Sequence, residues 1–252
     1  MEQTLGSEAH LEDLAIDYLP LEDISSPGTL TPVLVASTPR LNITSLSEMV
    51  RETGLQPAAV EIDGFSIAAG LIQEGKIGPD ETVLVLELGA HKASLSILAK
   101  RQMMFCRALP FTGEKLTQAV SDHLRVNWAE AEELKRRHGL TASNEEGENV
   151  ARALSSSTEN LLIDIAHSFK SFSYQTAQSN IRSFEKILLS GGGALLPRLP
   201  EFLQERLNAP AEIVDSLKFF PLAPSIEKLA PSASSPRFTL AMSLALREVS
   251  LS

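Results

Sequence analysis

The stretch KILLSGGGALLPRLPEFLQERL, residues 186–207, joins an apolar run to a segment with helical periodicity through three consecutive glycines. The apolar run predicts a strand, and the segment after the glycines predicts a helix. Glycine lets another backbone or a ligand approach closely, and the N-terminus of a helix offers unpaired N–H groups and a positive dipole end. We therefore expect the turn at Gly191, Gly192 and Gly193 to face a ligand such as a nucleotide.

Two other interpretations of this turn are possible from the sequence. Gly191 and Gly193 fit the start of the dinucleotide-binding motif G-x-G-x-x-G, but Leu196 stands at its third glycine. The turn also comes so late that little chain remains for the second half of such a sheet. A tight joint between a strand and a helix, with no ligand, is the remaining interpretation.

The chain on both sides of the glycine turn predicts alternating strands and helices. Upstream, three apolar runs joined by short turns predict an antiparallel meander, and three helical segments follow it. Downstream come a helix, a short strand, a Pro- and Ser-rich loop at 221–236 and a closing helix. The predicted strands are 82–88, 93–99, 103–110, 184–190 and 211–215, and the predicted helices are 113–126, 127–140, about 150–177, 196–207 and 238–249. This order is typical of the α/β class with mixed sheets.

The first third of the chain predicts a smaller body. Its pattern predicts strands at 14–19, 31–37 and 58–63 and helices at 41–55 and 64–75. The turn KIGPDE at 76–81 then indicates a boundary. We expect two domains, residues 1–75 and 76–252.

The net charge of −10 is unevenly distributed. The first 75 residues hold 12 acidic and 2 basic side chains, whereas the rest of the chain holds 20 of each. A nucleic-acid partner is disfavoured because a phosphate backbone needs basic counter-charge. A basic peptide is a suitable partner for the acidic third, and a solvated acidic surface is the alternative.

Several features predict a cytoplasmic location. The N-terminus MEQTLGSEAHLEDL lacks the apolar core of a signal peptide, and no apolar run is long enough to span a membrane. The single cysteine, Cys106, excludes an internal disulfide. The five histidines show no metal-ligand spacing, so we expect no metal site of protein ligands alone.

Three segments taken together resemble the second half of the actin-like ATPase superfamily, which has a ribonuclease H-like fold. They are LVLELGAHKASLSIL at 84–98, AEELKRR at 131–137 and LLSGGGALLP at 188–197. Further segments surround these three, and their order is similar to that in the type IV pilus assembly protein PilM family. They are GLQPAAVEIDGFSIAAGL, LPFTGEKLTQAVSDHLRVNWAEAEELKR and LAMSLALRE. No D-x-G-x-x-[ST] hairpin precedes Leu34, so the resemblance implies a chain that lacks the N-terminal part of the first lobe.

The resemblance implies a set of nucleotide-binding residues. A first turn approaches the phosphates, a helix brackets the adenine, and the glycine turn supports the adenosine. The implied residues are Gly89, Ala90, Lys92, Gly113, Glu132, Lys135, Gly191, Gly192 and Gly193. The first turn departs from the family pattern, because Glu87 stands for an aspartate and the following hydroxyl residues are replaced, although Lys92 offers a charge.

The resemblance also implies a function. We expect a cytoplasmic, actin-like scaffold that is held at the inner membrane through its partners. These are the N-terminal tail of an inner-membrane protein similar to PilN and components of the pilus motor. ATP, with or without magnesium, is expected as a structural or regulatory ligand, and catalysis as weak or absent. An active ATPase or kinase, or a division protein similar to FtsA, is the alternative.

Overall fold

The computed structural model describes residues 11–21, 33–175, 183–219 and 236–246. The chain divides into two units, one containing residues 1–62 and the other residues 63–247. The helix after residue 62 belongs with the second unit because it packs on that unit's sheet and closing helix. The division into functional domains after residue 75 stays a prediction.

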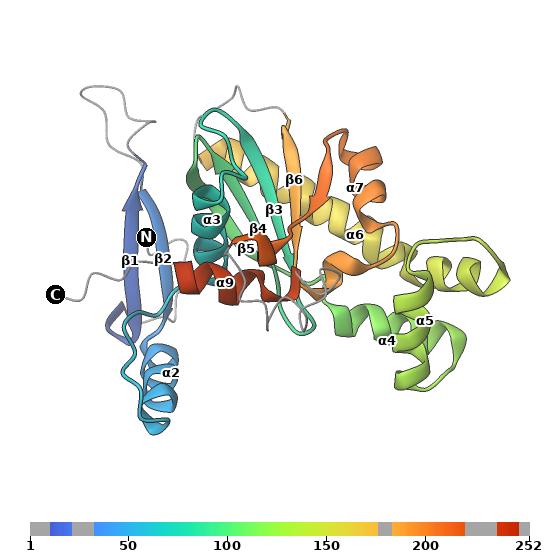
Figure 1. Cartoon of the computed structure of the whole chain (residues 1–252), viewed down its shortest axis with the longest axis horizontal. Coiled ribbons are helices and arrows are strands. Elements are labelled where there is room, and N and C mark those ends of the chain that lie inside the picture. Colours follow the sequence, from blue (N-terminus) through green and yellow to red (C-terminus); the bar gives the residue numbers. More distant parts are fainter. Residues whose placement is uncertain (1–10, 22–32, 176–182, 220–235, 247–252) are drawn as a thin grey trace. The chain divides into compact units, whose positions relative to one another are not determined.

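The described residues of the first unit form a two-stranded antiparallel sheet and one α-helix (Figure 1). A 3₁₀ turn at Leu11–Asp13 leads into β1 (Leu14–Pro20), which pairs with β2 (Val33–Pro39), and α2 (Arg40–Glu52) follows directly. The predicted strand at 58–63 is wrong: residues 55–62 have no regular structure, and β1 and β2 pair only with each other among the described strands. An alternating pattern does not form a strand without an edge to pair with.

The second unit is built on a five-stranded mixed sheet in the order β5-β4-β3-β6-β7. Its strands are β3 (Thr82–Leu88), β4 (Ala93–Ala99), β5 (Gln102–Leu109), β6 (Lys186–Ser190) and β7 (Ala211–Ile213). The predicted antiparallel meander of β3, β4 and β5 is confirmed, and β6 and β7 join it in parallel. Leu84, Ile97 and Leu188 are fully buried, so the core lies on the central strands.

Helices cover both faces of this sheet (Figure 1). On one face α3 (Asp63–Gln73) packs against α9 (Thr239–Leu246). The long helix α6 (Glu145–Gln175) runs behind the sheet in this view and buries Leu161 and Phe172 of its predicted apolar stripe. The predicted loop at 221–236 lies, except for its last residue, outside the described residues, as does the end of the closing helix beyond residue 246.

Helix α6 begins earlier than its apolar stripe predicts. The polar run before residue 150 indicates a loop, yet the helix starts at Glu145. The Asn144 Oδ1 atom accepts a hydrogen bond from Gly147 N at 2.8 Å, and three glutamates occupy the first turn. Such a cap and acidic first turn start a helix without apolar residues, which explains the difference.

Helices α4 (Gly113–Leu124) and α5 (Trp128–His138) form a packed pair beside α6. Each begins at a side-chain cap, Thr112 for α4 and Asn127 for α5. Beyond β6 the chain passes through a 3₁₀ helix, η3 (Gly192–Leu195), to α7 (Leu199–Leu207), and after β7 through a second one, η4 (Ser216–Phe219).

Candidate functional site

The candidate site lies at the carboxyl ends of the parallel strands β3 and β6, where Glu87 is the register partner of Ser190. Two turns leave this edge. Residues 89–92 return the chain from β3 into β4, and the turn is closed by a hydrogen bond from Gly89 N to Lys92 O at 2.9 Å. The glycine turn leaves β6. Ligands of α/β sheets bind outside the carboxyl ends of such strands.

The three glycines of the second turn have different surroundings. A Cβ atom on Gly191 would lie 2.5 Å from Leu88 O, and one on Gly193 would lie 2.8 Å from the same oxygen. Gly191 also has a φ of +81°, which disfavours side chains. These two glycines are therefore required by the approach of two backbones. Among the described residues, a Cβ atom on Gly192 would meet only the Arg237 side chain, at 3.7 Å, so none of their packing requires glycine there.

The sequence prediction of a helix that starts directly behind the glycine turn is wrong. The glycines enter the short η3, and α7 begins only at Leu199. Arg198 has a φ of +67°, so the chain changes direction between the two elements. Gly191 N donates to Pro236 O at 2.9 Å instead of facing solvent. The N-terminal N–H groups of α7 are thus not part of this turn.

The turn at 89–92 is attached to the start of α4. Gly113 N donates to Gly89 O at 2.9 Å, and Glu114 N donates to Ala90 O at 3.0 Å. A Cβ atom on Gly113 would lie 3.3 Å from Ala90 Cα, so this close approach favours glycine. His91 Nδ1 and Glu114 Oε1 lie 2.7 Å apart on the exposed side of the same contact.

Lys135 lies at the centre of a buried polar cluster between α4 and α5. Its Nζ atom donates to Glu132 Oε2 at 2.6 Å, to Thr117 Oγ1 at 2.7 Å and to Gly113 O at 3.1 Å. The three ammonium protons therefore have protein acceptors, and the side chain is about nine-tenths buried. Lys135 holds Glu132 and the first turn of α4 in place rather than projecting toward a ligand.

Glu132 keeps a negative charge in this cluster. Burial raises the pKa of its carboxyl, but hydrogen bonds from Lys135 and Thr117, together with the charges of Lys135 and Arg136, outweigh burial and lower the pKa overall. The side chain is 39% exposed, so the carboxylate remains accessible from one side.

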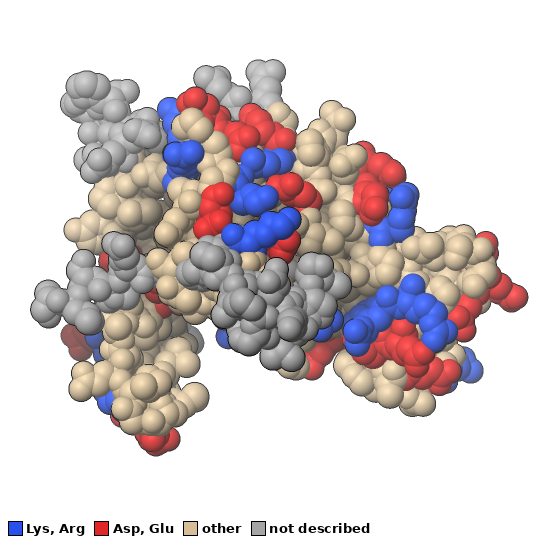
Figure 2. All heavy atoms as spheres, viewed as in Figure 1, with Lys and Arg blue, Asp and Glu red and all other residues tan. Residues whose placement is uncertain are grey.

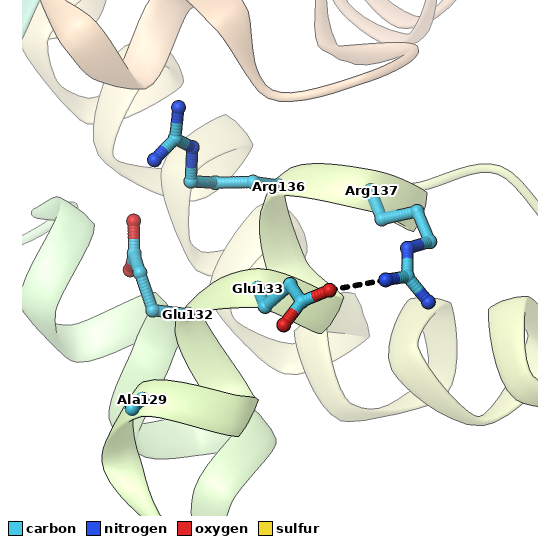
Figure 3. Close-up of a pocket in the computed structure, with 5 residues that line it drawn as sticks. All are labelled: Ala129, Glu132, Glu133, Arg136 and Arg137. Atoms are coloured by element: carbon cyan, nitrogen blue, oxygen red, sulfur yellow. Dashed lines mark hydrogen bonds and ion pairs between the residues drawn. The ribbon is translucent and has the colours of Figure 1, made fainter.

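A hollow of about 450 Å³ lies along α5 and is lined by Ala129, Glu132, Glu133, Arg136 and Arg137 (Figure 3). Glu132 and Arg136 extend to one side of the helix, whereas Glu133 and Arg137 pair with each other on the other side. Arg136 is exposed and makes no hydrogen bond or ion pair with a described residue. A carboxylate beside an unengaged guanidinium suits the hydroxyls of a ribose and the face of a base.

The end of α5 contacts the segment that follows the glycine turn. Leu140 N donates to Pro197 O at 2.9 Å, and a Cβ atom on Gly139 would lie within 2.7 Å of the Pro197 ring and backbone. Thus α5, the glycine turn and the turn at 89–92 are joined through direct contacts within the second unit. The nine residues implied by the resemblance lie on these connected segments, and Lys135 is engaged within the protein; their role in nucleotide binding stays a prediction.

Sequence reasoning missed two cations of this region, Arg136 and Arg237. Arg136 follows Lys135 directly and lies four residues after Glu132, which places it on the same helix face as Glu132. That spacing was available from the sequence. Arg237 lies more than 40 residues after the glycine turn, and the hydrogen bond between Gly191 and Pro236 joins its segment to the turn.

A model of the type IV pilus assembly protein PilM matches residues 9–249. The chain belongs to the PilM family. Among solved structures, the PilM–PilN type IV pilus biogenesis complex contains a chain that matches with a TM-score of 0.76 and 25% identity; the match covers 94% of this chain and 67% of that chain.

More distant structures show the fold of this PilM-family chain. MreB5 of Spiroplasma citri bound to AMPPNP matches with a TM-score of 0.60 and 13% identity over 83% of this chain and 64% of that chain. The ethanolamine utilization protein EutJ from Carboxydothermus hydrogenoformans matches with a TM-score of 0.55 and 15% identity over 87% and 62%. The actin-like α/β fold expected from the sequence is confirmed, and this chain spans about two thirds of the length of these proteins.

The described residues contain no group of three or more His, Cys, Asp and Glu side chains that could hold a metal ion. Within the same residues, no helix is long and apolar enough to cross a membrane.

Proposed function

We propose that this PilM-family chain is a cytoplasmic scaffold of type IV pilus assembly. The first unit binds a short basic, partly apolar tail of an inner-membrane protein similar to PilN, and so links that protein to components of the pilus motor. The second unit holds an adenine nucleotide as a structural or regulatory ligand. The observation that carries the proposal is an exposed apolar surface on the first unit, within the third of the chain that holds the net charge.

The sheet of the first unit presents an apolar face. Tyr18 and Val35 are register partners, and Pro20 pairs with Val33. Alternate residues of a strand share a face, so Ile16, Tyr18, Val33 and Val35 lie together. Their side chains are between 40% and 67% exposed. An exposed apolar patch is typical of a surface that binds another chain.

Helix α2 adds to the uncovered apolar surface. Its apolar residues Leu41, Leu46 and Met49 are all about half exposed or more, and the helix buries no residue. The part of the surface that α2 forms is mostly uncharged (Figure 2). The helix that the sequence predicts is present, but no described residue covers its apolar side.

The acidic charge of this unit suits the proposed partner. Cytoplasmic flanks of membrane segments are enriched in Lys and Arg, so the tail of an inner-membrane protein is commonly basic. Acidic side chains then increase the rate of encounter, while apolar anchors set the lifetime of the complex. The solved PilM–PilN complex supports a partner of this kind.

The test uses a synthetic peptide with the sequence of the partner's N-terminal tail and the full chain. Neutralising Glu12, Asp13 and Asp17 together should slow association and flatten its salt dependence; Glu22 and Asp23, also acidic, lie outside the described residues. Val35→Ser should speed dissociation about tenfold, because burying a valine is worth about 1.5 kcal/mol or more. Ile163→Ser, an exposed apolar residue of the second unit, is the matched control.

Two results would reject this part of the proposal. One is an association rate that ignores both salt and the three substitutions. The other is a dissociation rate that changes equally in Val35→Ser and Ile163→Ser. Either outcome would favour a solvated acidic surface without a binding role.

The adenosine part of a nucleotide fits the residues of the second unit. The hollow along α5 offers the Glu132 carboxylate and the Arg136 guanidinium on one side of the helix. Gly192 adds a position where the fold leaves space for a ligand. Titration with adenosine tests this part independently of the phosphates: Arg136→Ala should weaken binding, and Arg152→Ala on α6 should not. Equal effects of the two substitutions would contradict the assignment.

A further inference from the structure

The acidic residue near the end of β3 is withdrawn from the surface. Glu87 is largely buried, and its Oε2 atom meets no hydrogen-bond partner among the described residues. Burial raises the pKa of its carboxyl; the Ser190 hydroxyl opposes the shift, and the Asp63 carboxylate adds to it. Coordination of a divalent cation needs an accessible, charged carboxylate, so Glu87 in this setting does not fit that role.

Two cations border the same edge of the sheet instead. Lys92 lies in the turn that follows β3 and is exposed. Arg237 lies beside Gly192 and is also exposed. Neither makes a hydrogen bond or ion pair with a described residue. By contrast, His91 pairs with Glu114, and Lys135 is held by its three acceptors.

The contacts of Leu88 place the turn that carries Lys92 next to the glycine turn, which Arg237 also borders. The Leu88 oxygen is the atom against which Gly191 and Gly193 pack, and Lys92 follows Leu88 by four residues. The glycine turn is therefore bordered by the turn that carries Lys92, and Arg237 reaches the middle glycine. Lysine and arginine are the side chains that neutralise phosphate in proteins.

We propose that Lys92 and Arg237 neutralise the phosphate groups of the bound nucleotide directly, so that binding needs no divalent cation. This inference rests on the proposed nucleotide ligand. Two fixed positive charges replace the charge that a metal ion would supply, and Gly192 lets the phosphates approach the backbone between them. The ligand class is a nucleoside diphosphate or triphosphate bound in its metal-free form.

The experiment is a calorimetric titration of the full chain with ATP, in EDTA and in magnesium, and with adenosine as a second probe. The affinity for ATP should differ less than threefold between the two buffers. Lys92→Ala and Arg237→Ala should each weaken ATP binding about tenfold in EDTA and leave adenosine binding unchanged. Lys92→Arg should retain binding because it keeps the charge.

Lys100→Ala is the matched control, because it removes the same charge from an exposed lysine at the opposite end of β4. Its affinity for ATP should equal that of the wild type. Thermal unfolding of each variant shows that the fold is retained.

The outcomes separate this inference from the proposed function. Binding of ATP in magnesium alone, or equal losses in Lys92→Ala and Lys100→Ala, would overturn the role of the two cations and leave the nucleotide ligand standing. Failure of both ATP and adenosine to bind in either buffer would overturn the nucleotide ligand and this inference together.

Discussion

Substitution of the three glycines one at a time separates a structural requirement from a ligand requirement. At Gly191 an alanine must adopt a φ of +81°, which costs about 1–2 kcal/mol, and its Cβ atom would lie 2.5–2.9 Å from backbone atoms of Leu88. Overpacking of that kind costs about 1–3 kcal/mol more. The total loss of unfolding free energy for Gly191→Ala is then about 2–5 kcal/mol.

The other two glycines give different values. For Gly193→Ala the only cost we expect is the close contact with Leu88, which should lower the unfolding free energy by about 1–3 kcal/mol. Among the described residues, Gly192→Ala meets nothing closer than the Arg237 side chain, so its stability should stay within about 0.5 kcal/mol of the wild type. For a chain of this size, 1 kcal/mol corresponds to about 2–4 °C in Tm, so the three variants are distinguishable by thermal unfolding.

Nucleotide binding should depend on Gly192, the position at which an alanine costs the least stability. Gly192→Asp keeps the fold, but its carboxylate occupies the space left for a ligand and repels phosphate. ATP should therefore raise the Tm of the wild type and not that of Gly192→Asp. A full thermal shift in Gly192→Asp, or a loss of stability in Gly192→Ala as large as that in Gly191→Ala, would refute the reasoning.

Three further predictions concern stability. Lys135→Met should lower the unfolding free energy by about 2–4 kcal/mol in urea, because it leaves the Glu132 carboxylate without its buried partner; a change under 0.5 kcal/mol would show that the cluster is not structural. Lys100→Asn should raise the Tm by about 2 °C, because Lys100 has a φ of +52° and asparagine tolerates that region better; a lower Tm would contradict this. The folded-state pKa of Glu87 is raised above 4.5, so its contribution to stability is full below pH 4.5 and is lost as the pH rises through the folded-state pKa. Glu87→Gln stays neutral and should be more stable than the wild type at pH 7 but not at pH 4, and urea titrations with equal differences at both pH values would exclude this account.

Local patterns in the sequence predicted most of the second unit. Short turns between apolar runs predicted the meander of β3, β4 and β5, and the order of motifs indicated the actin-like fold. The start of α6 was misplaced because it depends on the Asn144 cap rather than on apolar periodicity. The strand predicted at 58–63 failed because strand formation depends on a neighbouring edge, which a local pattern does not reveal.

The candidate site was predictable where its residues are close in sequence. The spacing of Glu132 and Lys135 predicted one helix face, but their mutual ion pair and the burial of Lys135 depend on Gly113 and Thr117 of another helix. The three glycines differ because Gly191 and Gly193 pack against Leu88 and Gly192 does not, and Leu88 lies about 100 residues earlier in the sequence. The position of Arg237 beside the glycine turn depends on the long-range hydrogen bond between Gly191 and Pro236, which no local sequence pattern predicts.

Helix α2 of the first unit should open locally more readily than the central strands of the second unit. Because α2 buries no residue, little free energy opposes its unfolding, and its amide protons should exchange with solvent far sooner than those of the central strands. A chain that docks on this helix would add protection to it without adding any to β3 or β6. Hydrogen exchange along residues 40–52 would then report occupancy of the first unit, and a protease that cleaves only the open helix would remove the unoccupied molecules.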